Sequence, residues 1–269
     1  PSARPSARPS ARPSARPSAR PSAWPSALLA MGPTAAHLPR AAARLWIGRH
    51  GVKESRHERP SNWRLLLTGA GAAEVEAAAQ RLAAQGASGS RGAPQRVVCS
   101  PFPRCVVTAG IYARVLCLPS ICIEPGLCEV LTPNMGAKGL RGPRPTWTEA
   151  ELLGFLAASG AEGVQLDASY VPAVRVEDLH SVECETDRSE VEERVGVLAS
   201  HVEAGTFDGS LLVTHGSPAY RLVRALTGER GFAEPPMGSI IELVECPGSG
   251  GSWGRVESFE CPSAGSSQV

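Results

Sequence analysis

Aromatic residues are scarce in this sequence, and long apolar runs are missing. Phe, Trp and Tyr make up 5% of its 269 residues, so its helices must pack through small side chains. No stretch approaches the ~18 uncharged apolar residues of a membrane-spanning helix, which argues against a membrane partner. The eight cysteines include no C-x-x-C pair and no zinc-ligand spacing. We interpret them as reduced thiols of a cytoplasmic protein, and Cys99 and Cys122 lie in apolar runs.

Acidic residues are absent from the first 30 positions, which carry five arginines. Because the formal net charge of the whole chain is +1 and these arginines contribute +5, residues 31–269 carry a net charge of −4. Nucleic-acid binding requires a concentrated basic face. We therefore expect no nucleic-acid partner.

The chain begins with a tetrapeptide array, PSAR, that occupies residues 1–27 in slightly varied form. Proline at every fourth position excludes a helix, and nothing in the array can form a core. We expect residues 1–43 to be disordered, as we do the tail 263–269. An organelle-targeting segment is one interpretation; repeat slippage or a misplaced start, with Met31 as an internal start, is the one we favour.

From residue 44 the sequence alternates between strand and helix patterns. Apolar runs predict strands, and amphipathic segments with caps at Thr68, Ser100, Thr148 and Ser217 predict helices, the first ending before Gly86. The strands are expected at 44–48, 95–100, 120–124 and 210–215, with a closing pair at 239–246 and 253–261, and the helices at 67–86, 101–116, 147–159, 186–205 and 217–228. This order predicts an α/β fold, a three-layer α/β/α sandwich with a mainly parallel central sheet. It forms one domain over 44–262, in which the segment 160–186 is irregular and the region 132–185 is expected to be a lid.

Two of the predicted strands end in the same way. In "LWIGRHG" the apolar run is followed by Arg49, His50 and a glycine, and in "LLVTHGS" it is followed by His215 and a glycine. Ligands of parallel sheets bind beyond the carboxyl ends of the strands. We therefore expect His50 and His215 to meet at one edge of the sheet.

Two further segments place charged side chains at that edge. "SPFPRCVVTA" sets Arg104 in the first turn of a helix, where free N–H groups favour an anion. "EPGLCEVL" places Glu129 in the loop after the third strand, with Glu124 nearby as the alternative carboxylate. Fixed positive charge, a nucleophile and an acid together suit a phosphoryl group.

These segments, with "LTGAG" at 67–71, resemble in their order the motifs of the histidine phosphatase superfamily, the phosphoglycerate-mutase-like fold. "IEPGLCEVL" and "LDASYVP" are similar to the branch of ubiquitin-associated and SH3-containing phosphatases and steroid-phosphate phosphatases. The resemblance implies that His50 is the phosphate-accepting nucleophile. It also implies that Arg49, Arg104 and His215 hold the phosphoryl oxygens and that Glu129 is the general acid and base. No metal or cofactor is implied, because arginines supply the charge.

One position departs from the phosphatase branch. Lys53 stands where that branch has a further arginine, so bidentate phosphate contact is lost there while the charge is kept. A cofactor-dependent mutase is the alternative enzyme, although its usual Ser and Asn after the triplet are missing from "RHGVKESRHERPSNW". A non-catalytic phosphate-binding scaffold is the alternative from another class. The sequence predicts a phosphorylated small molecule or phosphoprotein as substrate and leaves a homodimer open.

Overall fold

The computed structural model describes residues 43–55, 64–88, 92–130, 147–175, 188–246 and 252–259, with backbone only at 188–190 and 257–259. The PSAR array, the tail and much of the expected lid lie outside these ranges, so the expectations about them stay predictions. No described helix is long and apolar enough to cross a bilayer.

The described strands form one seven-stranded sheet in the order β4-β3-β2-β5-β1-β6-β7. The parallel members are β1 (Arg44–Arg49), β2 (Arg96–Cys99), β3 (Ser120–Ile123), β4 (Gln165–Leu166) and β5 (Ser210–Thr214). The closing pair, β6 (Ile240–Glu245) and β7 (Trp253–Phe259), is antiparallel. The mainly parallel sheet and its closing pair are confirmed. The short β4 lies in a segment predicted to be irregular, where it extends the edge of β3.

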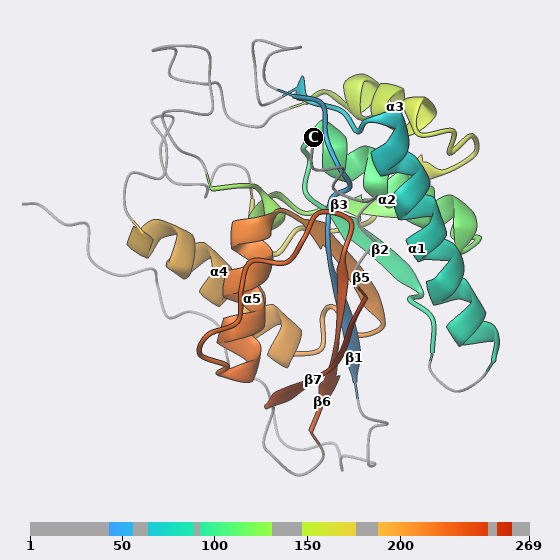
Figure 1. Cartoon of the computed structure of the whole chain (residues 1–269). Helices are drawn as coiled ribbons and strands as arrows, with labels where there is room; N and C mark the ends of the chain where they lie inside the picture. The colour runs from blue at the N-terminus through green and yellow to red at the C-terminus, as the bar shows by residue number, and fades with distance from the viewer. Residues whose placement is uncertain are drawn as a thin grey trace, which may run out of the picture. The chain divides into compact units, whose positions relative to one another are not determined.

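Helices cover both faces of this sheet, as the α/β/α prediction requires (Figure 1). On one face α1 (Gly69–Ala87) packs on α2 (Pro103–Val115), and α2 packs on α3 (Glu149–Ala158). On the other face α4 (Arg188–Glu203) packs on α5 (Gly216–Thr227). The predicted apolar stripe of α4 is buried at Val191, Val195, Leu198 and Val202. Cys99 and Cys122 also lie in the core.

The predicted caps of α1 and α3 are largely confirmed. Thr68 Oγ1 accepts a hydrogen bond from Gly71 N at 3.0 Å, and Thr148 forms a capping box with Glu151. The predicted end of α1 was wrong, because Gly86 lies inside the helix and Ser88 is the C-cap. A Cβ at Gly86 would lie 2.5 Å from Ala93 Cβ, so this glycine permits close chain approach.

Two other predicted helix starts were wrong. α2 begins at Pro103 with Phe102 as N-cap, rather than at Pro101 after Ser100. α5 begins at Gly216 with His215 as N-cap, rather than with Ser217. The Ser100 hydroxyl lies 3.0 Å from His215 Nε2, so the expected cap of α2 has a tertiary partner instead.

Candidate active site

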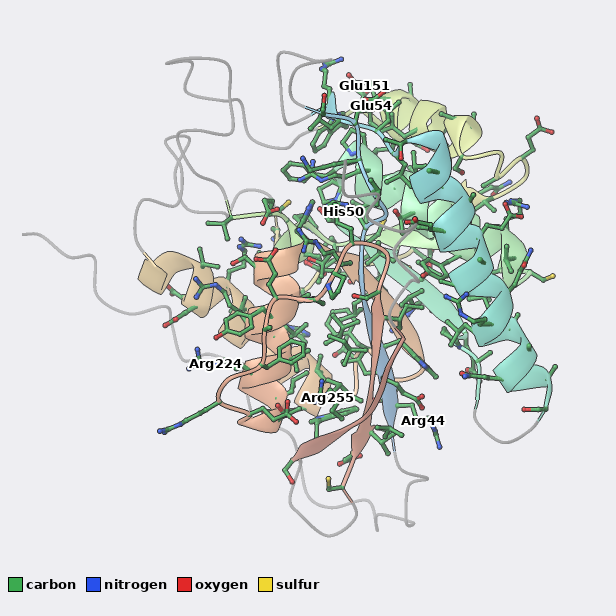
Figure 2. All side chains as sticks on the ribbon, in the orientation of Figure 1. Arg44, His50, Glu54, Glu151, Arg224 and Arg255 are labelled. Carbon is green, nitrogen blue, oxygen red and sulfur yellow. The ribbon has the colours of Figure 1, made fainter. Side chains whose placement is uncertain are left out.

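The carboxyl ends of the central parallel strands bring the predicted residues together. The register pairs Arg49 with Thr214 across β1 and β5, and His50 N donates a hydrogen bond to Thr214 O at 3.0 Å. As a result, the rings of His50 and His215 have centroids 5.2 Å apart. Figure 2 shows His50 beyond one end of β1, while Arg44 lies at the other.

His50 is almost fully buried, with 1% of its surface exposed. Its Nδ1 lies 2.8 Å from the carbonyl oxygen of Gly51. A carbonyl oxygen can only accept, so Nδ1 carries the proton and Nε2 carries the lone pair. Burial, and next the charge of Arg104, hold the pKa of His50 well below its usual value. His50 is therefore a neutral imidazole with its lone pair on Nε2 near neutral pH.

The turn after His50 is fixed from two sides. Gly51 N donates to Thr108 Oγ1 at 3.2 Å, and that hydroxyl donates to Arg104 O at 2.7 Å. On the other side, a Cβ at Gly51 would lie 2.7 Å from Val75 Cγ2 and 2.9 Å from Gly71 O. Only glycine lets α1 approach this closely, so the turn that carries His50 is held between α1 and α2.

His215 is fully buried and has partners on both ring nitrogens. Arg104 Nη2, which can only donate, lies 3.1 Å from Nδ1. The Nε2–H is therefore left to donate to Ser100 Oγ. Burial lowers the pKa of His215 well below its usual value, and Arg104 lowers it further. His215 is thus also neutral, and Ser100 is a partner that sequence reasoning assigned to a helix cap.

Arg104 is fully buried in the first turn of α2. A cation there opposes the helix dipole, and a buried charge requires an anionic partner. Glu129 Oε2 is 3.9 Å from Arg104 Nη2, and the guanidinium lies over the Phe102 ring at 4.7 Å from its centroid. The buried positive charge of Arg104 therefore favours a negative group next to His215.

Glu129 reaches the same cluster from the loop after β3. Its Oε2 lies 3.7 Å from His215 Nδ1, and 24% of its side chain is exposed. Burial raises the pKa of this carboxyl, although the charge of Arg104 acts in the opposite direction. A raised pKa keeps the carboxyl protonated to higher pH, which suits a proton donor that solvent can reach.

The loop that carries Glu129 is fastened by a residue that the sequence reading missed. Arg194 of α4 is buried, and its Nη1 donates to Gly126 O at 2.6 Å and Cys128 O at 2.8 Å. Its Nη2 also lies 3.4 Å from Glu129 O. Arg194 falls three residues after Val191 on the apolar stripe of α4. A cation at a position predicted to be buried could have identified it as a residue with a specific partner.

Glu124, the alternative carboxylate, has a different environment. It is fully buried and accepts hydrogen bonds at one oxygen from Gly126 N and Val174 N and at the other from Ala173 N and the Tyr170 hydroxyl. Burial raises its pKa, against these hydrogen bonds. Glu124 ties the segment 170–174 to β3 and the turn η2 (Pro125–Leu127). With both oxygens engaged by the surrounding chain, it is poorly suited to deliver a proton to a substrate.

Arg49 precedes His50 in the chain, and Lys53 follows it by three positions. Both cations contribute to the lowered pKa of His50, after burial and Arg104. Arg49 Nη1 donates to Pro235 O at 2.7 Å and lies 3.0 Å from Glu234 Oε1. Lys53 forms an isolated bridge with Leu67 just before α1. The Glu234 contact was not anticipated from the sequence.

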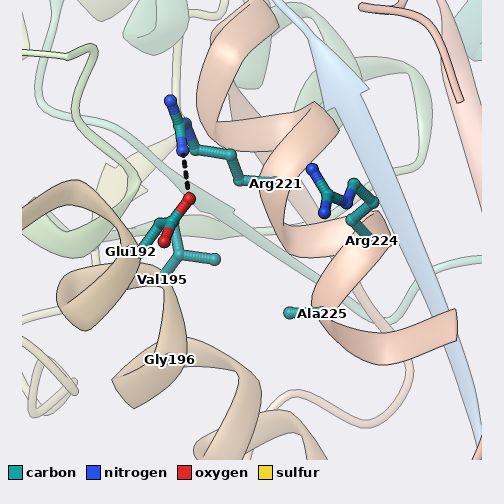
Figure 3. A pocket seen from close by; sticks show the side chains of 6 residues that line it. All are labelled: Glu192, Val195, Gly196, Arg221, Arg224 and Ala225. Carbon is teal, nitrogen blue, oxygen red and sulfur yellow. Dashed lines mark hydrogen bonds and ion pairs between the residues drawn. The ribbon is translucent and has the colours of Figure 1, made fainter. Parts of the chain in front are cut away.

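A pocket of about 240 Å³ lies elsewhere, between α4 and α5 (Figure 3). Arg221 Nη1 and Glu192 Oε1 form an ion pair across it at 3.1 Å, and none of the predicted site residues line it. Among the described residues, no group of three or more His, Cys, Asp or Glu side chains is placed to hold a metal ion.

The chain has the fold of several solved phosphatases, as the resemblance to histidine phosphatases implied. Similar solved structures include the ecdysone phosphate phosphatase of Bombyx mori in complex with tungstate, with 18% identity, a TM-score of 0.60 and coverage of 84% of this chain and 96% of that one. A mycobacterial glucosyl-3-phosphoglycerate phosphatase has 21% identity, a TM-score of 0.51 and coverage of 80% and 97%. The α-ribazole phosphatase of Shigella flexneri has 17% identity, a TM-score of 0.50 and coverage of 79% and 94%. No family model and no curated protein sequence matches the chain. The resemblance inferred from the motifs is thus confirmed as a fold.

Proposed function

We propose that this protein is a metal-independent phosphomonoesterase that works through a phosphohistidine on His50. The observation that carries the proposal is the hydrogen bond from His50 Nδ1 to Gly51 O. It leaves the lone pair on Nε2, and burial, together with nearby cations, lowers the pKa of the ring. A neutral imidazole in a positively charged setting is suited to attack a dianionic phosphoryl group.

In the first step His50 Nε2 attacks phosphorus, and the ester P–O bond breaks. Arg49, Arg104 and Lys53 balance the charge on the phosphoryl oxygens. Neutral His215 accepts a hydrogen bond from Arg104 and donates one to Ser100 within the same cluster. Glu129 gives its proton to the departing alkoxide oxygen. The raised pKa of Glu129 is what keeps that proton available.

In the second step a water molecule attacks the phosphohistidine. Glu129, now a carboxylate, accepts the proton of that water, the P–N bond breaks, and inorganic phosphate is released with His50 neutral again. The two steps use one carboxyl first as acid and then as base. The positive charge that other phosphoryl-transfer enzymes take from Mg²⁺ comes here from arginine and lysine side chains.

The substrate class we propose is a phosphate monoester, either a small molecule or a phosphoprotein. The similar structures are named for three different phosphate esters, so their common fold does not select among substrates. One of them holds tungstate, a phosphate-like oxyanion, which supports an oxyanion site in this fold. A cytoplasmic location and a homodimer remain predictions.

Rapid acid-free denaturation of the protein during turnover of a radiolabelled phosphate ester tests the proposal. We expect acid-labile, base-stable label on the wild-type chain and none on a His50→Ala variant. Activity should survive EDTA and be inhibited by vanadate. Label that persists in His50→Ala, or turnover with no labelled protein at all, would refute the phosphohistidine mechanism. A mutase would return a phosphate ester isomer instead of inorganic phosphate.

A further inference from the structure

A carboxylate of the chain itself reaches the candidate phosphoryl site. Glu234 lies in the connection between α5 and β6, and its Oε1 is 3.0 Å from Arg49 Nη1. About half of the Glu234 side chain, 52%, is exposed. The bond is thus an ion pair at the rim of the site, made by one of the arginines expected to hold phosphate.

The same carboxylate lies against the residue that follows His215. A Cβ built on Gly216 would be 1.6 Å from Glu234 Oε1, so the oxygen occupies the space directly over the first residue of α5. A negative group is favoured at a helix N-terminus. Glu234 also raises the pKa of Glu129, which places its charge within electrostatic reach of the acid.

We propose that Glu234 is an internal oxyanion that an incoming phosphoryl group must displace from Arg49. This inference rests on the proposed phosphate site. A carboxylate and a phosphoryl group offer the same chemistry to Arg49, because both accept charge-assisted hydrogen bonds from a guanidinium. They cannot both take the position 3.0 Å from Nη1, so a phosphoryl oxygen that binds there breaks the Glu234 ion pair.

Two consequences follow from this competition. Glu234 weakens the binding of every phosphoryl ligand, including the product inorganic phosphate, and its return to Arg49 helps to expel that product. After displacement its charge stays near the rim, because the side chain is half-exposed and the carbonyl oxygen of the next residue, Pro235, accepts a hydrogen bond from Arg49. Repulsion then disfavours esters that carry a second anionic group and favours esters of uncharged alcohols.

The test compares inorganic phosphate binding by the whole chain, by Glu234→Gln and by Glu229→Gln, using calorimetry at constant ionic strength. Gln keeps the size of Glu234 but cannot hold Arg49 as an ion pair. Glu229 is the matched control, since it is a half-exposed acid of the same connection and contacts Arg255 at 3.7 Å. Breaking a half-exposed ion pair weakens the binding of a competing anion by up to about fivefold. Removing the repulsion between Glu234 and phosphate adds to this gain in affinity. We expect phosphate to bind about 3- to 10-fold more tightly to Glu234→Gln and unchanged to Glu229→Gln.

Phosphate affinity that stays unchanged or falls in Glu234→Gln overturns the inference, as does an equal gain in Glu229→Gln. The measurement needs no turnover, so it separates this inference from the proposed function. Tighter phosphate binding in an inactive protein supports the role of Glu234 and contradicts the phosphatase. Phosphohistidine turnover without the affinity gain supports the phosphatase and contradicts the role of Glu234. If no variant binds phosphate, the role of Glu234 is wrong, and the phosphohistidine label alone decides the proposed function.

Discussion

Glu129→Gln is the substitution that tests the proposed acid most directly. Gln keeps the size of the side chain but cannot give a proton to a departing oxygen. Positioned proton transfer contributes about 10²–10⁴ in rate, equivalent to about 3–5 kcal/mol of barrier. For an alkyl phosphate, whose alkoxide leaves poorly, we expect kcat/KM to fall by this full amount.

For p-nitrophenyl phosphate the same substitution is expected to cost far less in kcat/KM, because nitrophenolate leaves without a proton. Hydrolysis of the phosphohistidine still needs Glu129 as base, so kcat can fall and a pre-steady-state burst should appear. The variant should also lose the alkaline limb of the pH profile. In the wild type that limb marks the raised pKa of Glu129, above which the acid form is lost, and the acid limb marks the lowered pKa of His50.

The assay is stopped-flow and steady-state kinetics with both substrates over a range of pH. Glu162→Gln, at an exposed acid in the turn before β4, is the control and should match the wild type. Equal losses in kcat/KM for the alkyl and aryl substrates would refute the reasoning, because a binding or folding defect does not depend on the leaving group.

Other expectations follow from the buried groups around the site. Relative to a His50→Asn/His215→Asn variant, urea unfolding of the wild type should show stability falling as pH drops from 7 to 5, because the unfolded histidines take up protons that the folded ones refuse. The difference is at most about 1.4 kcal/mol per pH unit for each histidine, and no difference would contradict the lowered pKa values. Arg194→Met should leave buried carbonyls unpaired and lower the free energy of unfolding by about 2–5 kcal/mol. We expect a fall in Tm and a loss of alkyl phosphatase activity, and an unchanged Tm would contradict the role of Arg194. Glu124→Gln should lower stability by about 1–3 kcal/mol yet leave the alkyl-to-aryl ratio of kcat/KM unchanged, whereas a changed ratio would move the acid to Glu124.

Local signals were sufficient for most of the elements. Apolar runs located β1, β2, β3 and β5, because a strand buried between helices on both faces must be apolar along its length. The spacing of Val191, Val195, Leu198 and Val202 identified the buried face of α4, since side chains three and four apart share one side of a helix. The pairing of His50 with His215 followed from their place after two strands expected to be parallel.

The start of α2 and the end of α1 were wrong because the expected capping residues have tertiary contacts. Ser100 has the composition of an N-cap, but its hydroxyl bonds to His215, which is 115 positions away in the chain. Gly86 has the composition of a helix end, but it lies within α1 because another segment packs against it. Propensity describes what a residue can do locally, and packing decides which option is used.

The sequence by itself determined the α/β order and the residues that reach the edge of the sheet. Only the tertiary structure decided the state and partners of those residues. The proton on His50 Nδ1 depends on the turn at Gly51, which α1 and α2 hold in place. The role of Glu124 depends on hydrogen bonds from residues about 50 positions further along the chain. Arg194 and Glu234 reach the site from α4 and from the connection after α5. Because such contacts are set by long-range packing, no short stretch of the sequence encodes them.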